Sequence, residues 1–89
     1  LMETESYEAA IKDFDAAQKA GDNSLQLFLD KAKAYVMQDN TKAAITELTN
    51  AINIDKNNSD AYFNRALIKE GIGDFEGAVI DYNRVISLN

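Results

Sequence analysis

Residues 61–89 form the stretch AYFNRALIKEGIGDFEGAVIDYNRVISLN, which predicts the fold more clearly than any other part of the chain. Its second half places apolar and small residues three and four positions apart, the spacing of one stripe along an amphipathic helix. That stripe consists of Phe75, Ala78, Val79, Tyr82, Val85 and Ile86. A shorter stripe precedes it at Tyr62, Ala66 and Leu67. Residues 71–73, Gly-Ile-Gly, can adopt the left-handed backbone that ends a helix, so the stretch predicts a helical hairpin.

The same pattern recurs when the chain is shifted by 34 residues, and it recurs again at a second shift of the same size. The coinciding sets are Ala10, Ala44 and Ala78; Ile11, Ile45 and Val79; Phe14, Leu48 and Tyr82; Phe28 and Tyr62; Ala32 and Ala66. Self-similarity at a fixed period is typical of stacked units that share one continuous core, and such proteins usually offer a surface to other proteins.

We therefore expect five helices in one layered all-α domain. Three equivalent helices are predicted to begin after Ser6, Asn40 and Asp74, because the oxygens of these side chains can accept hydrogen bonds from free backbone N–H groups. Two further helices are predicted between them, over Leu25–Gln38 and Asp60–Gly71. The polar joints at 20–24 and 55–60 connect successive hairpins, and Asp39-Asn40 tolerate the left-handed backbone of a tight joint.

Composition limits the classes of function. With 89 residues, 46% of them apolar and 27% charged, the chain suits one small globular domain, and no apolar run is long enough for membrane insertion. Nine Lys and Arg against fifteen Asp and Glu give a net charge of −6, which would repel nucleic acid. The chain has no Cys, so its composition does not indicate a compartment.

Enzymatic chemistry is not expected. The chain has neither His nor Cys, and so lacks the usual base near neutral pH and the usual thiol nucleophile. We expect Asp13, Asp15, Glu47 and Asp81 to be solvated on helix surfaces. Residues 55–66 begin like a calcium loop but lack its sixth-position glycine and final glutamate, so we expect a capped turn there. We expect no cofactor and no metal.

The stretch quoted above resembles a tetratricopeptide repeat of the common A-Y-x-N-R-A…G-D-F/Y-x-x-A-I-x-D-Y kind. Residues 25–58 resemble a second, full repeat, and residues 5–24 resemble the closing helix of an earlier one. The resemblance covers nearly the whole chain, so residues 1–89 are expected to form a single domain, with 59–89 a full, slightly truncated repeat. Two positions depart from the family pattern, Lys69 where an aromatic residue is usual and Lys56 where proline is usual.

The resemblance implies an alpha-alpha superhelix, a right-handed solenoid of antiparallel helices whose first helices line a concave groove for peptides or partner helices. Carried onto this chain, the partner-binding positions are Gln26, Leu29, Lys33, Met37, Phe63, Asn64 and Leu67, together with Asp30, Val36, Asp60 and Glu70. Leu29 and Phe63 are equally compatible with a core role, and Val36 is expected to be a core residue.

Some members of this family hold the carboxylates of chaperone C-termini with a Lys/Asn/Lys/Arg constellation. Only Asn64 stands at a matching position here. Leu29 and Lys33 occupy the places where Lys and Asn would be needed, so we do not expect that activity.

We expect a non-catalytic protein-interaction scaffold, part of a longer protein, that binds a peptide or helix in its groove. The alternative is a structural module that forms a homo-oligomer through its uncapped repeat ends. Two and a half repeats are fewer than usually suffice for stability, and no polar capping helix follows Val85, Ile86 and Leu88.

Overall fold

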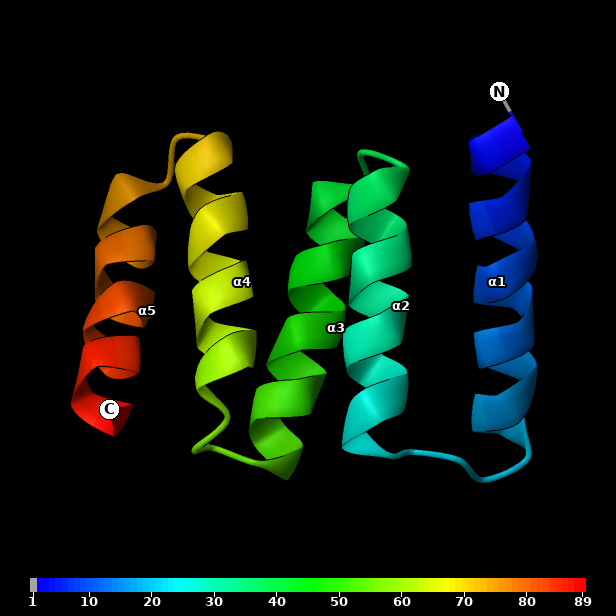
Figure 1. Ribbon diagram of the computed structural model, residues 1–89, viewed down its shortest axis with the longest axis horizontal. Coiled ribbons are helices and arrows are strands. Elements are labelled where there is room, and N and C mark those ends of the chain that lie inside the picture. Colours follow the sequence, from blue (N-terminus) through cyan, green and yellow to red (C-terminus); the bar gives the residue numbers. More distant parts are fainter. Residues whose placement is uncertain (1) are drawn as a thin grey trace.

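The computed structural model describes residues 2–89, and it describes the surroundings of the side chains of residues 6–89. Over the described residues the chain forms only helices: α1 (Met2–Lys19), α2 (Leu25–Met37), α3 (Thr41–Ile54), α4 (Ser59–Gly71) and α5 (Phe75–Leu88). They stand antiparallel and side by side in sequence order, in a slab of 35 × 30 × 17 Å with the two ends of the chain at opposite sides (Figure 1). The expected all-α class is confirmed.

Side-chain caps begin four of the helices. The side-chain oxygens of Ser24, Asn40, Asn58 and Asp74 each accept a hydrogen bond from the backbone N–H three residues later, at 2.9–3.3 Å. The caps expected at Asn40 and Asp74 are therefore confirmed. The start expected after Ser6 is wrong, because α1 begins at Met2. Residues 2–6 contain neither proline nor glycine, so the sequence holds no strong signal that would stop a helix there.

The tight joints after α2 and α4 have the same geometry. Asp39 has φ 61° and Gly73, exactly one period later in the sequence, has φ 89°. The next backbone N–H in each joint donates to a carbonyl five residues back, from Asn40 to Tyr35 at 2.9 Å and from Asp74 to Lys69 at 2.8 Å. This pattern of left-handed residue and returning hydrogen bond ends a helix and reverses the chain, as expected from the sequence.

Alanines allow the helices to pack closely. Ala44 and Ala51 on α3 and Ala61 and Ala66 on α4 are fully buried, and Ala32 on α2 is nearly so. Larger side chains complete the core between them, namely Phe28, Leu48, Ile52, Tyr62 and Ile68. Since helix axes approach most closely where side chains are small, this core holds α2 and α4 against the same neighbour, α3, and a concave surface remains between them.

Candidate functional site

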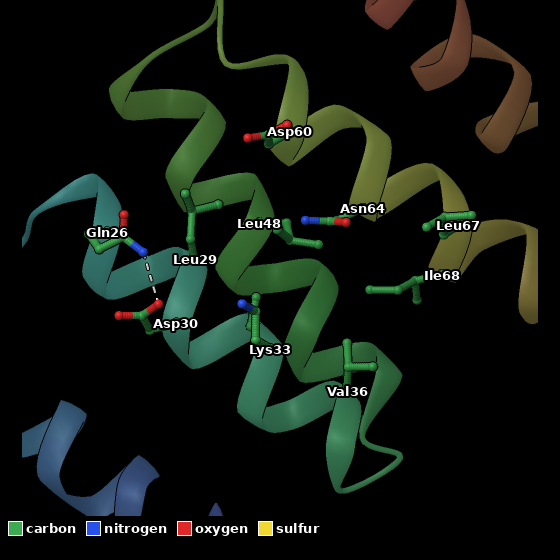
Figure 2. A pocket seen from close by; sticks show the side chains of 11 residues that line it. Gln26, Leu29, Asp30, Lys33, Val36, Leu48, Asp60, Asn64, Leu67 and Ile68 are labelled. Atoms are coloured by element: carbon green, nitrogen blue, oxygen red, sulfur yellow. Dashed lines mark hydrogen bonds between the residues drawn. The ribbon is translucent and has the colours of Figure 1, made fainter.

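A groove of about 360 Å³ lies between α2 and α4 (Figure 2). Its floor is apolar, because Ala32, Leu48 and Ile68 reach it from the core and are each at most 9% exposed. The rest of the lining consists of Gln26, Leu29, Asp30, Lys33, Val36, Asp60, Asn64 and Leu67. Two parallel helices supply these walls because α2 and α4 are equivalent helices of successive hairpins.

The chemistry of the lining changes along the groove. Asp60 lies in the first turn of α4, near the end of the groove that Gln26 and Asp30 line from α2. The Nε2 atom of Gln26 donates to Oδ1 of Asp30 at 2.9 Å, which holds that carboxylate in place. Lys33 and Asn64 follow in the middle of the groove (Figure 2).

The other end of the groove is aliphatic. Val36 from α2 and Leu67 from α4 are 42% and 47% exposed there, above the buried Ile68. The same three residues also line a second, more open hollow of about 530 Å³, whose other lining residues are Asp39, Thr41, Gly71 and Ile72. The concave surface therefore continues toward the joints that follow α2 and α4.

The structure brings most of the predicted groove residues together. Gln26, Leu29, Lys33, Asn64 and Leu67 all line the groove. Met37 and Phe63 are exposed but are not among the lining residues. Their contact with a partner, like that of the other five, stays a prediction.

Phe63 of α4 and Val36 of α2 are both partly exposed, at 44% and 42%. The ring of Phe63 packs edge-on against Tyr82 of α5, with ring centroids 5.9 Å apart, and the hydroxyl of Tyr82 donates to Glu70 at 2.7 Å. These contacts turn Phe63 toward α5. The core role expected for Val36 is wrong, because its side chain stands at the rim of the concave surface.

Behind this surface lies a buried ion pair that the sequence reasoning missed. Asp81 is 1% exposed and accepts two hydrogen bonds from Arg65, both of 2.8 Å. Arg65 also donates to Oγ1 of Thr49 at 3.1 Å, and the ammonium of Lys69 lies 3.3 Å from Asp81. The expectation of solvated carboxylates is therefore wrong for Asp81, since its carboxylate is enclosed between α4 and α5.

One period earlier, a second buried ion cluster surrounds Lys31, which is 5% exposed. Its ammonium lies 2.7 Å from Asp15, 2.9 Å from Oε1 of Gln18 and 3.4 Å from Glu47. Glu47 is 8% exposed, so the expectation of a solvated side chain is wrong here too. The signal in the sequence was the recurrence of a cation followed sixteen residues later by an acid, at Lys31 and Glu47 and again at Arg65 and Asp81.

The pKa values of these groups favour their charged forms. Burial alone would raise the pKa of Asp81, but the hydrogen bonds and charge of Arg65, with the charge of Lys69, hold it below its ordinary value. Burial would lower the pKa of Lys31, and the hydrogen bond to Asp15 with the charges of Glu47 and Asp15 raises it above its ordinary value instead. The ion pairs join neighbouring helices and belong to the scaffold of the groove.

Among the side chains of residues 6–89, no three His, Cys, Asp or Glu gather closely enough to hold a metal ion. Within residues 2–89, no helix combines the length and the apolar character that crossing a membrane requires.

Comparison with known proteins points to one family. A profile described as "Tetratricopeptide repeat" matches residues 59–89. Human "Tetratricopeptide repeat protein 6" is 43% identical over 53 residues, covering 60% of this chain and 10% of the relative. The "DnaJ homolog subfamily C member 7 homolog" of Dictyostelium discoideum is 32% identical over 92 residues, covering 99% of this chain and 17% of the relative. The chain thus spans less than a fifth of the length of these relatives.

A solved structure of the second TPR of Spaghetti (RPAP3), bound to the HSP90 peptide SRMEEVD, has the same fold. It superposes with a TM-score of 0.84 at 26% sequence identity, covering 93% of this chain and 77% of that one. The expected helical solenoid is thereby confirmed.

Proposed function

Because the chain belongs to the tetratricopeptide repeat family, we propose that it is a non-catalytic scaffold that holds a peptide or partner helix in the groove between α2 and α4. The observation that carries the proposal is the groove itself, an apolar floor of Ala32, Leu48 and Ile68 walled by polar and aliphatic side chains. Concave apolar sites with a few polar groups are the usual form of a binding site. That a solved relative binds a peptide adds support.

We further propose that the scaffold works within a longer protein. The support is that the alignments with the two relatives cover only 10% and 17% of the lengths of those proteins.

Selection from a library of random dodecapeptides displayed on phage tests the groove. Clones enriched on the wild-type chain should lose binding to Leu67→Arg, because the longer charged side chain fills the aliphatic end. They should keep binding to Ile80→Arg, a matched control on α5 whose native side chain is 68% exposed and lies outside the lining. Circular dichroism should show equal helicity for both variants. If the clones bind both variants with the same affinity as the wild-type chain, the binding site lies outside this groove.

A second candidate function is self-association through α5. The observation that favours it is the row of exposed apolar residues on that helix, with Phe75 at 63%, Val79 at 55% and Ile86 at 71% exposure. The equivalent residues of α3 are less exposed, because Ile45, one period before Val79, is half-buried against the core and Ile52, one period before Ile86, is 7% exposed. Apolar patches of this kind mark interaction surfaces.

Sedimentation velocity over a concentration series tests this second function. A self-associating chain should shift to a larger species with rising concentration, and Ile86→Arg should abolish the shift. A strictly monomeric wild-type chain at the highest concentration removes the proposal.

A further inference from the structure

We propose that the groove selects an extended peptide carrying a basic side chain about three residues from an aliphatic one, and that it discriminates against peptides with acidic ends. This inference rests on the proposed function, because it names the chemistry of the ligand that the same groove would hold.

The lining of the groove carries a net negative charge. The lining residues supply two carboxylates, Asp30 and Asp60, against one ammonium, Lys33. The adjoining hollow adds a third carboxylate, Asp39. Lys33 stands one helical turn after Asp30 on the same face of α2, where opposite charges attract each other. The electrostatic potential along the groove is therefore negative, in line with the net charge of −6 of the whole chain. A negative potential complements a basic ligand.

The two carboxylates share one end of the groove. Asp60 lines it from the first turn of α4 and Asp30 lines it from α2, and in Figure 2 Leu29 lies between the two. The hydrogen bond from Gln26 orients the Asp30 carboxylate before any ligand arrives. A guanidinium or ammonium beside either carboxylate would gain a charge-assisted hydrogen bond, whereas a carboxylate there would meet like charge.

The opposite end selects for an apolar side chain. Val36 and Leu67 are 42% and 47% exposed, and the floor between them is the buried Ile68. An aliphatic side chain lying there would remove apolar surface of both partners from water, which contributes roughly 25 cal/mol for each Å² buried. The carboxylate of Asp39 lines the adjoining hollow and is not among the groove-lining residues, so an aliphatic group at this end of the groove contacts mainly apolar side chains.

The length of the groove sets the spacing of the two anchors. Asp60 and Leu67 are separated by seven residues on α4, a rise of roughly 10 Å at about 1.5 Å per residue. Asp30 and Val36, separated by six residues on α2, give roughly 9 Å by the same rule. A peptide extended in the polyproline II conformation advances about 3.1 Å per residue and presents every third side chain on the same face, so its basic and aliphatic side chains should be three residues apart.

The middle of the groove fits the backbone of such a peptide. Asn64 can donate to a carbonyl and accept from an N–H group, and Lys33 can donate. Neither side chain needs a particular ligand residue, so specificity lies at the two ends.

Sequencing the clones from the dodecapeptide selection tests the inference. Among clones whose binding is lost in Leu67→Arg, Arg or Lys should be enriched three residues from Leu, Ile, Val or Met. The best clone is then synthesised with a fluorescent label, together with its Arg→Glu form and the acidic peptide SRMEEVD. The Arg→Glu form should bind at least tenfold more weakly, and SRMEEVD should not bind at concentrations that saturate the parent peptide.

Charge removal in the groove supplies the matched comparison. The double variant Asp30→Asn/Asp60→Asn should weaken binding of the basic peptide about tenfold. The control Glu8→Gln/Asp13→Asn removes the same charge from exposed positions on α1 and should leave binding unchanged.

The possible outcomes separate the inference from the function on which it rests. Groove-dependent clones that are acidic, or SRMEEVD binding as tightly as the parent, would overturn the inference and leave the scaffold function standing. A selection without any groove-dependent clone would overturn both. Equal weakening by the groove and control double variants would also overturn the inference, because it would show a general effect of net charge.

Discussion

Lys31 and Arg65 are equivalent residues of successive repeats, yet their charges are held differently. Arg65 presents its planar fork to both oxygens of Asp81, whereas the ammonium of Lys31 is shared among Asp15, Gln18 and Glu47. A bidentate pair is matched in geometry as well as in charge. One carboxylate oxygen of Glu47 is buried without a hydrogen-bond partner, so the earlier ion cluster is the less completely satisfied of the two.

Loss of the Asp81 charge should destabilise the fold. Asp81→Asn leaves the Arg65 guanidinium against a neutral amide that cannot accept both hydrogen bonds, which should cost about 2–4 kcal/mol of unfolding free energy. Asp13 occupies the equivalent position on α1 and is exposed, so Asp13→Asn should change the free energy by less than about 0.5 kcal/mol. Urea denaturation measures both. Equal stability of the two variants would show that the buried pair contributes nothing.

Acid should reduce the contribution of Asp81 to stability. Its pKa in the folded chain is lowered, so the unfolded chain takes up the proton first as the pH falls. The stabilisation is therefore fully present above the unfolded value of about 3.9 and is lost as the pH falls through the folded pKa. The difference in unfolding free energy between wild type and Asp81→Asn should shrink from pH 6 toward pH 2. A constant difference over that range would contradict the prediction.

At the scale of the element, the ends of the helices depend on single backbone conformations. Gly71 ends α4 with helical backbone, whereas Gly73 has φ 89°, and a Cβ on either would meet no atom within 4 Å. Both positions therefore have room for an added Cβ, and they differ only in backbone conformation.

Two alanine substitutions should consequently act in opposite directions. Gly71→Ala should raise the unfolding free energy by about 0.5–1 kcal/mol, because alanine restricts the unfolded chain and favours helix. Gly73→Ala should lower it by about 1–2 kcal/mol, because a Cβ is strained in the left-handed region. Thermal unfolding of the two variants measures the difference, and shifts of the same sign would contradict the assigned conformations.

The alanine contacts between helices can be tested in a similar pairwise way. Ala44 of α3 is fully buried, so Ala44→Leu should cost on the order of 1–3 kcal/mol through overpacking. Ala16 of α1 is exposed, so Ala16→Leu should leave the melting temperature nearly unchanged. An unchanged melting temperature for Ala44→Leu would place that residue outside a close helix contact.

At the scale of the whole molecule, features with a local cause were predictable. The 34-residue period predicted the number and order of the helices. Asn40 and Asp74 cap helices as expected, and Asp39 adopts the left-handed backbone expected at its joint. Features that depend on packing between helices were not predictable from one stripe of apolar residues. The burial of Glu47 and Asp81 requires a cation on the neighbouring helix, and the turn of Phe63 toward Tyr82 requires the position of α5.

The linear order of the helices should also determine which part of the molecule opens first. α1 packs mainly against α2, whereas α3 is held between α2 and α4 and supplies much of the core. In a stacked repeat, the stability of each unit comes from its own contacts and those of its neighbours. Amide hydrogen exchange should therefore be fastest in α1 and slowest in α3.

The ion cluster of Lys31 offers a direct test of that gradient, because Asp15 on α1 contacts this cation of α2 at 2.7 Å. Asp15→Ala should accelerate exchange in α1 and leave α4 and α5 unchanged, since coupling along the stack passes only between neighbours. Asn83 occupies the equivalent position on α5 and is exposed, so Asn83→Ala should change exchange in neither region. Uniform acceleration in all five helices by Asp15→Ala would mean that the molecule opens as a single unit, and that the repeat order does not control its local stability.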